Sequence, residues 1–155
     1  MKKRTILLTV ATLLAGAAVC FAADNPFVGT WKLNEAKSKL AAGAAKNNTV
    51  VYEAAGDSIK VTVDGVDAKG KSVHDDWTGK FDGKDYPATG DPTMDARSYK
   101  MVDAHTLSMT VKKDGKVTIS GRIVVSADGK TRTVTTTITD SMGMKTTGVA
   151  VYDKQ

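Results

Sequence analysis

The sequence predicts an all-β protein: an antiparallel up-and-down (meander) barrel of about eight to ten strands, with a short helix after the first strand. The first observation behind this is that apolar side chains recur at every second residue, as in Ile59, Val61 and Val63. The second is that Asp-Gly pairs, which favour tight chain reversals, separate these runs. Because an open meander of about nine strands would leave two exposed edges, we expect the sheet to close on itself.

The first 22 residues have the order of charges and apolar residues that is typical of a secretory signal peptide. Three basic residues precede the uncharged apolar run Thr5–Val19, which is shorter than the roughly 20 residues needed to span a bilayer. Lipoprotein anchoring at Cys20 is disfavoured, because Val19 stands where that processing needs a small residue. We therefore predict cleavage near Ala22 and a periplasmic or secreted location.

Cleavage would leave residues 23–155 as a single domain without cysteine, so no disulfide is expected to stabilise it. Three of the 22 Lys and Arg residues would leave with the signal, and the 19 that remain against 17 acidic residues give a net charge of +2. A charge this small, spread along alternating strands, does not indicate a nucleic-acid partner. We expect a monomer with no transmembrane segment after cleavage.

Strands are expected along most of the remaining chain, with five reversals between them. Alternate residues such as Leu107, Met109 and Val111 are expected on an inner face, as is the series from Val117 to Val125. The expected strands are residues 28–33, 49–54, 58–64, 72–81, 96–102, 106–112, 116–126, 131–140 and 144–153. The expected reversals are Asp64-Gly65, Asp82-Gly83, Asp103-Ala104-His105, Asp114-Gly115 and Asp128-Gly129.

Two segments break this pattern. Asn34–Asn48 reads as a short helix beginning near Asn34, followed by an Ala/Gly connection that could cover one mouth of the barrel. Tyr86–Thr93 contains Pro87 and Pro92, and a proline gives no hydrogen-bond donor to a sheet. We therefore expect no regular central strand in that second segment.

Asn25–Leu33, which reads Asn-Pro-Phe-Val-Gly-Thr-Trp-Lys-Leu, resembles the opening strand of the calycin group, the lipocalins and fatty-acid-binding proteins. In that group a Gly-x-Trp begins the barrel and its Trp plugs the closed end, which implies these roles for Gly29 and Trp31. The run Lys80–Pro87 and the residues after it also resemble small secreted bacterial lipocalin-like proteins, and the resemblance covers nearly all of residues 23–155.

The resemblance departs from the group at the end of the chain. Val149–Lys154 is similar to the closing strand of fatty-acid-binding proteins, which carries an Arg-x-Tyr that holds a carboxylate. Here Ala150 stands in the Arg place, and only Tyr152 matches. The connection after the first strand is also shorter than that family's helical lid. The resemblance therefore does not imply a fatty-acid ligand.

Several large side chains are candidates for a ligand-binding barrel interior, since aromatic and methionine side chains could line an apolar pocket. The same side chains could instead fill the barrel completely. Many other inward residues are Val, Ile, Ala, Thr and Gly, which leave space, so we favour a cavity. The candidates are Trp77, Phe81, Tyr99, Met109 and Tyr152.

Three arginines, Arg97, Arg122 and Arg132, follow the signal segment. One could pack over Trp31, as an Arg does at the closed end of lipocalins, and another could recognise an anionic ligand. Arg122 lies on the face opposite the apolar residues of its strand, and we expect Arg132 to stand in the same relation to Val134. We assign Arg122 and Arg132 to closing the barrel, together with Gly29 and Trp31, and favour structural or surface roles over ligand capture.

His74, Asp75 and Asp76 form the densest polar cluster, and these residue types could bind a metal or act as acid and base. On a strand, however, His74 and Asp76 share one face while Asp75 points to the other, so we favour a solvated outer face. The sequence has no His-x-x-x-His, no Cys pair, no Gly-x-Ser-x-Gly and no Walker loop. No catalytic residue, metal or cofactor is predicted.

Three functions remain open from the sequence. The first is an exported protein that binds a small apolar or amphipathic molecule inside the barrel. The second is an interaction or inhibitor module that uses the loops of a filled barrel. The third is an enzyme centred on His74, which is the weakest because no nucleophile, base and orienting group can be assembled.

Overall fold

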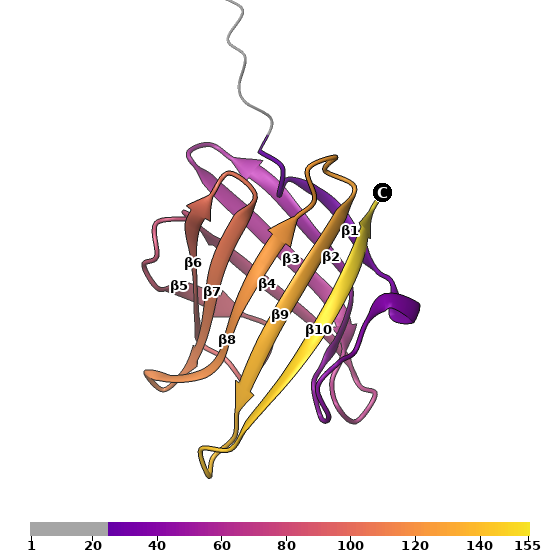
Figure 1. The fold of residues 1–155 in the computed structure, drawn as a ribbon. Coiled ribbons are helices and arrows are strands. Elements are labelled where there is room, and N and C mark those ends of the chain that lie inside the picture. The colour runs from indigo at the N-terminus through magenta and orange to yellow at the C-terminus, as the bar shows by residue number, and fades with distance from the viewer. Residues whose placement is uncertain (1–24) are drawn as a thin grey trace, which may run out of the picture.

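A computed structural model describes residues 25–155, which form a closed barrel of ten antiparallel strands (Figure 1). Strands adjacent in the sequence are adjacent in the barrel, as predicted for a meander. The strands are β1 (Gly29–Leu33), β2 (Lys46–Ala55), β3 (Ser58–Val66), β4 (Ser72–Gly79), β5 (Tyr86–Thr89), β6 (Ala96–Asp103), β7 (Thr106–Lys113), β8 (Lys116–Val125), β9 (Thr131–Thr139) and β10 (Lys145–Lys154). The predicted signal peptide, residues 1–22, lies outside the described residues. Within the described range, no helix is long and apolar enough to cross a membrane.

The ring closes at β1, which pairs with strands from both ends of the chain. Trp31 lies opposite Lys154 of β10 on one side and opposite Val50 of β2 on the other. Because each described strand is hydrogen-bonded on both sides, the barrel presents no sheet edge for pairing with another chain. The predicted closure is confirmed.

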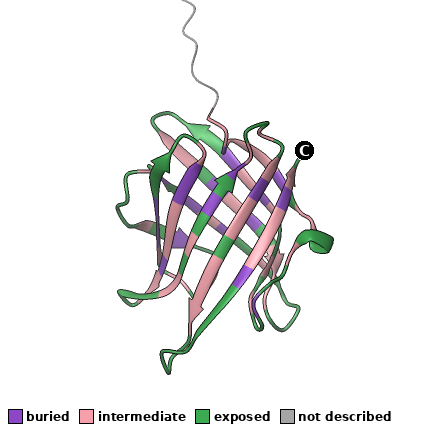
Figure 2. Cartoon of the chain, in the orientation of Figure 1, coloured by how far each residue is buried: buried purple, intermediate pink, exposed green. Residues whose placement is uncertain are grey.

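Burial alternates along the strands, as Figure 2 shows, which confirms the two-residue period. Val61 and Val63 are buried on the inner side of β3 as predicted. Val117 is the exception, because 47% of it is exposed although the alternation placed it inside. The register between β7 and β8 shifts at this point, so that Thr118 is an extra residue and Val117 turns outward.

The prediction that Asp-Gly pairs mark chain reversals is correct at some of these pairs and wrong at others. Asp114 and Gly115 both have positive φ angles, 50° and 72°, as the tight turn between β7 and β8 requires. Asp64-Gly65 is not a reversal, because β3 continues to Val66. A Cβ atom on Gly65 would lie 2.2 Å from the carbonyl oxygen of Lys46, so glycine serves close strand packing there.

The segment around Pro87 does form a strand, contrary to the sequence-based expectation. β5 has only four residues and pairs with β4 through two residue pairs and with β6 through two more. Pro87 has no N–H to donate, but the next residue compensates: the N–H of Ala88 donates to the carbonyl oxygen of Asp95 at 3.0 Å. A proline is therefore tolerated because the strand is short.

The predicted helix is a single 3-10 turn, η1 (Glu35–Lys37). Asn34 caps it, since its side-chain oxygen accepts a hydrogen bond from the N–H of Lys37 at 3.2 Å. The following connection runs back along β10, where Lys39 forms a bridge with Val149. The connection, rather than the turn itself, reaches the end of the barrel.

Candidate functional site: the barrel cavity

The barrel is not filled, because a cavity of about 690 Å³ lies within it. Small-molecule sites typically measure about 300–1,000 Å³. Connections 40–45, 67–71 and 90–94 border the cavity at one end of the barrel. Residues 25–28, which directly precede β1, lie at the opposite end (Figure 1). An apolar band on the wall consists of Val50, Val63, Val111, Ile119, Val134 and Ile138.

Small residues on β10 line part of the cavity. Gly148 and Ala150 both border the cavity. A Cβ atom on Gly148 would lie 2.3 Å from the backbone nitrogen of Ala41, so only glycine lets the 40–45 connection approach β10 this closely. The same glycine therefore positions one border of the cavity.

Trp31 fills the end of the barrel beside Phe27. It is fully buried, and its indole N–H donates to the carbonyl oxygen of Phe27 at 2.9 Å. Gly29 has a φ of 131°, and a Cβ atom there would meet the Lys154 side chain, whose Nζ lies 5.2 Å from the centroid of the Trp31 ring. Gly29 thus lets a lysine close over the tryptophan.

Arg132 lies inside this closed end, stacked among aromatic rings. It is 2% exposed, and its Cζ lies 5.3 Å from the ring centroid of Trp31, 5.2 Å from that of Tyr52 and 4.4 Å from that of Tyr152. Tyr152 is its directly opposite residue in the pairing of β9 with β10. The interaction of a guanidinium with several ring faces fixes this corner of the barrel.

The two arginines assigned to barrel closing differ in position. Arg122 is exposed on the outer wall, so its assignment is wrong. Arg132 and Val134 both border the cavity, which corrects the expectation that they occupy opposite faces. The signal that separates the arginines is present in the sequence, because Arg132 shares its face with Val134 and Ile138 whereas Arg122 opposes the apolar face of its strand.

Three of the five predicted interior residues, Tyr99, Met109 and Tyr152, border the cavity. The other two do not border the cavity and belong to the aromatic core. The Trp77 ring lies edge-on to that of Tyr99, with centroids 4.8 Å apart, and Phe81 packs in the same way at 5.8 Å. Phe81 follows the end of β4 rather than lying within it, which places it in the aromatic core instead of on the cavity wall.

A buried ion pair lies on the cavity wall between β4 and β6. Nη2 of Arg97 donates to Oδ1 of Asp75 at 2.9 Å, and the side chains are only 6% and 5% exposed. Nη2 also lies 3.0 Å from the sulfur of Met94. Burial raises the pKa of Asp75 above its ordinary value, and the Arg97 guanidinium limits the rise.

The buried guanidinium groups have donors without acceptors. Nε of Arg97 has no hydrogen-bond partner, and neither Nε nor Nη1 of Arg132 has one. No carboxylate of the described chain pairs with Arg132. Buried polar groups are normally satisfied, so these three nitrogens are exceptions within the barrel interior.

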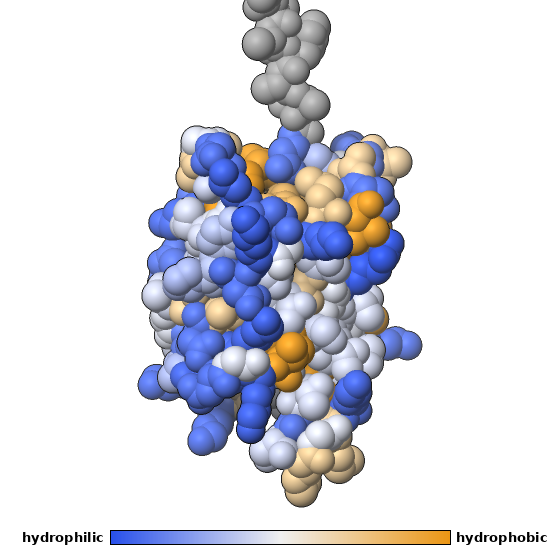
Figure 3. All heavy atoms as spheres, turned by 90° about the vertical axis from the view of Figure 1, so that its left-hand side faces the viewer, coloured by the Kyte–Doolittle hydropathy of each residue, from blue (hydrophilic) through white to orange (hydrophobic). Residues whose placement is uncertain are grey.

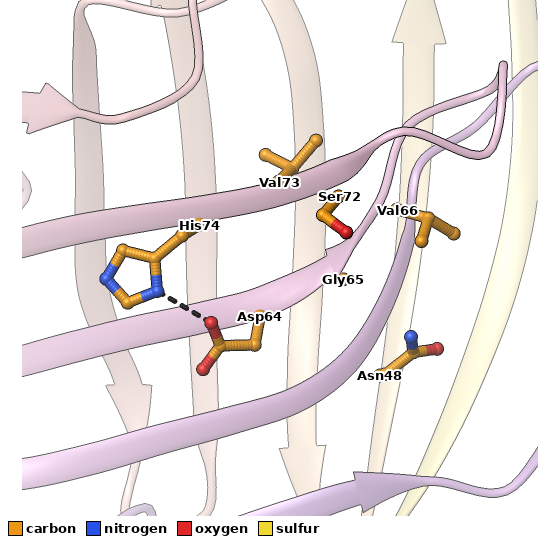
Figure 4. Close-up of a pocket in the computed structure, with 7 residues that line it drawn as sticks. All are labelled: Asn48, Asp64, Gly65, Val66, Ser72, Val73 and His74. Carbon is orange, nitrogen blue, oxygen red and sulfur yellow. Dashed lines mark hydrogen bonds and ion pairs between the residues drawn. The ribbon is translucent and has the colours of Figure 1, made fainter.

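His74 lies on the outer wall, in a shallow pocket shown in Figure 4. Nδ1 of its ring lies 2.6 Å from Oδ1 of Asp64, and Nε2 lies 3.2 Å from Oδ2 of Asp76. Two effects of Asp64 raise the pKa of His74: its hydrogen bond to the ring is the larger, and its negative charge is the second. Both ring nitrogens are thus engaged, and no cluster of ligating residues suited to a metal ion occurs between residues 25 and 155. This geometry does not support an enzyme centred on His74.

No protein-family model and no curated protein matches the chain. Among solved structures, the chain is similar to one described as EF1p2_mFAP2b bound to DFHBI, with a TM-score of 0.50, 9% identity, and coverage of 84% of this chain and 94% of that one. The fold is calycin-like. A redesigned β-barrel, b11L5F_LGL, gives a TM-score of 0.47 at 13% identity, covering 84% of this chain and 92% of that chain. Lobster apocrustacyanin A1 gives 0.41 at 13% identity, covering 86% of this chain and 63% of the lobster chain.

Proposed function

We propose that the protein is an exported binder of a small apolar or amphipathic molecule, which it holds inside the barrel. The cavity of about 690 Å³ is the observation that carries this proposal. Its apolar band would remove the ligand's hydrocarbon surface from water, a gain of roughly 25 cal/mol for each Å² buried. Figure 3 shows one outer face of the barrel, which is mostly hydrophilic with scattered apolar residues.

The interaction module with a filled barrel is less well supported. Its premise was a packed interior, and the described barrel contains open volume instead. Binding in a barrel of this kind has a general parallel, since the similar structure described above is bound to DFHBI. The identity of the ligand is not implied by that likeness.

Export is part of the proposal and rests on the N-terminal sequence alone. Expression of the full chain in a bacterial host, followed by intact-mass measurement of the envelope fraction, tests it. We expect the mature protein to begin at Ala23. Recovery of the uncleaved chain from the cytoplasm would contradict it.

Two adjacent residues of β9 allow a matched test of binding inside the barrel. Val134 borders the cavity, whereas Thr135 is exposed on the outer wall. Val134→Trp places a large side chain in the cavity, and Thr135→Trp places the same side chain outside. We expect the neutral fluorescent probe N-phenyl-1-naphthylamine to bind V134W at least tenfold more weakly than the wild type, a loss of about 1.4 kcal/mol.

The control T135W should bind the probe like the wild type, and circular dichroism should show that both variants retain the barrel. Equal binding by V134W and T135W would place the probe on the surface and contradict the proposal. Failure of the wild-type protein to bind any apolar probe would also contradict it.

A further inference from the structure

One carboxylate lies on the inner wall of the barrel. Asp75 borders the cavity and is only 4% exposed. Its neighbours along β4, His74 and Asp76, pair with each other on the outer wall, so the side chain of Asp75 lies on the inner face of the strand. Val63, its partner on β3, also borders the cavity and belongs to the apolar band. Asp75 therefore places an acidic group beside apolar side chains inside the barrel.

The two oxygens of this carboxylate differ in their contacts. Oδ1 accepts a hydrogen bond from Nη2 of Arg97 at 2.9 Å, whereas no N–H or O–H of the described residues donates to Oδ2. Among the described residues, the fully enclosed side-chain nitrogens and oxygens without a partner belong to Arg97 and Arg132. Oδ2 of Asp75 is therefore not fully enclosed, and its accessible surface lies on the cavity side. An ionised carboxylate can accept about four hydrogen bonds, so this one has unused capacity that a bound molecule can reach.

The charges around the cavity limit which donor fits this oxygen. Arg97 already neutralises Asp75, and Arg132 is a second buried cation that borders the cavity. An ammonium group would add another positive charge to this interior without a carboxylate of its own, which is costly. A carboxylate ligand would be repelled at Asp75 and has no proton to donate at neutral pH. A neutral hydroxyl group donates a hydrogen bond and adds no charge.

Asp75 lies close to the mouth of the cavity. The 90–94 connection borders the cavity at its mouth and packs directly on β4, since a Cβ atom on Gly90 would lie 3.0 Å from Cα of Asp75. A molecule with a hydroxyl group on Oδ2 therefore keeps its polar end near the mouth. Its apolar part faces the apolar band of the cavity wall, which includes Val50, Val111 and Val134.

We infer that the ligand carries a neutral hydroxyl group, which donates a hydrogen bond to Oδ2 of Asp75 near the mouth of the cavity. Arg97 is a positioning residue in this arrangement, because it holds the carboxylate through Oδ1 and leaves Oδ2 for the ligand. The inference rests on the proposed function, since it specifies the ligand class of the same cavity.

Two isomers that differ in the O–H group test the hydroxyl. 1-Decanol and 1-methoxynonane contain the same atoms, but only the alcohol can donate a hydrogen bond. Each would be titrated at pH 7.5 against wild-type protein carrying bound N-phenyl-1-naphthylamine, and its affinity read from displacement of that probe. We expect decanol to bind at least fivefold more tightly than the ether. Equal affinities, or no displacement by either isomer, would overturn the inference and leave the proposed function intact. Failure of the fluorescent probe itself to bind would overturn both.

Asp75→Asn exchanges the free acceptor for a donor. The asparagine oxygen remains on Arg97, so its NH₂ group takes the place of Oδ2. Both isomers have an oxygen that accepts from this group, so we expect the preference for decanol to fall below twofold in D75N. The control Asp76→Asn changes a side chain on the outer wall and should keep the wild-type preference. An unchanged preference in D75N would overturn the inference, because the hydroxyl group would be held elsewhere.

A measurement on the wild type covers the case in which D75N fails to fold. D75N removes one partner of a buried ion pair, and circular dichroism shows whether the barrel is retained. If it is not, carbon-13 NMR of the aspartate carboxyl groups in the wild type takes its place. Decanol should shift the Asp75 carboxyl resonance, methoxynonane should not, and the Asp76 resonance should stay unchanged with both. No shift at Asp75 with decanol, or equal shifts with the two isomers, would overturn the inference.

Discussion

The buried pair of Asp75 and Arg97 gives the sharpest test of the interior's electrostatics. Asp75→Asn keeps the size of the side chain and an oxygen that can accept from Arg97, but it removes the negative charge. The guanidinium would then remain in an environment where the pair is only about 5% exposed, without a counter-ion. Removing one partner of a buried ion pair typically costs about 3–5 kcal/mol.

We expect the lower end of that range, about 3 kcal/mol, because the hydrogen bond to the asparagine oxygen persists. For a domain of this size, each kcal/mol lowers the melting temperature by roughly 3–4 °C, so D75N should melt about 10 °C below the wild type. Differential scanning calorimetry and urea unfolding measure the two quantities.

The neighbouring residue provides the control. Asp76 points outward, where it contacts His74, Thr62 and Lys60, and its side chain is 38% exposed. Exposed ion pairs contribute about 0–1 kcal/mol, so Asp76→Asn should change stability by less than a third of the D75N effect. Equal losses in the two variants would refute the reasoning, because they would mean that water reaches Arg97 as freely as it reaches the outer wall.

Two further predictions concern the outer wall and the border of the cavity. His74 has a raised pKa, so its contacts stabilise the folded state below the pKa of the unfolded chain, and this stabilisation is lost as the pH rises through the folded value. An NMR titration should show the His74 ring titrating at higher pH than in Asp64→Asn, and identical midpoints would contradict this. Gly148→Ala should push connection 40–45 away from β10, with faster hydrogen exchange there than in the wild type. Unchanged exchange would show that glycine is not required.

Much of the fold could be predicted because local patterns specify it. Alternating apolar residues fix which face of each strand is buried. The number of reversals indicates a meander of many strands, and closure of that meander leaves no exposed sheet edge. Asp114-Gly115 adopts the positive φ angles that its sequence favours. Asp64-Gly65 has the same residue types and does not turn. Its glycine instead allows the backbone of Lys46 to pack closely against it, and the local sequence does not encode this contact.

The site was less predictable for a related reason. Alternation indicates that Asp75 faces inward, but it does not reveal that Arg97 lies 22 positions along the chain at hydrogen-bond distance. In the barrel, β4 with Asp75 and β6 with Arg97 are separated by β5. The sequence analysis did not expect β5, because of Pro87, and so it could not predict this pairing. The volume of the cavity likewise depends on how the strands close, which composition constrains only through the small inward residues such as Gly148.

Native mass spectrometry tests the central claim most directly. The wild-type protein and V134W would be purified side by side from an envelope fraction without denaturation, and any bound molecule would be released by collisional activation. The account predicts one small molecule per wild-type chain, and little or none on V134W. Wild-type protein of apo mass that also fails to take up an apolar probe would contradict it.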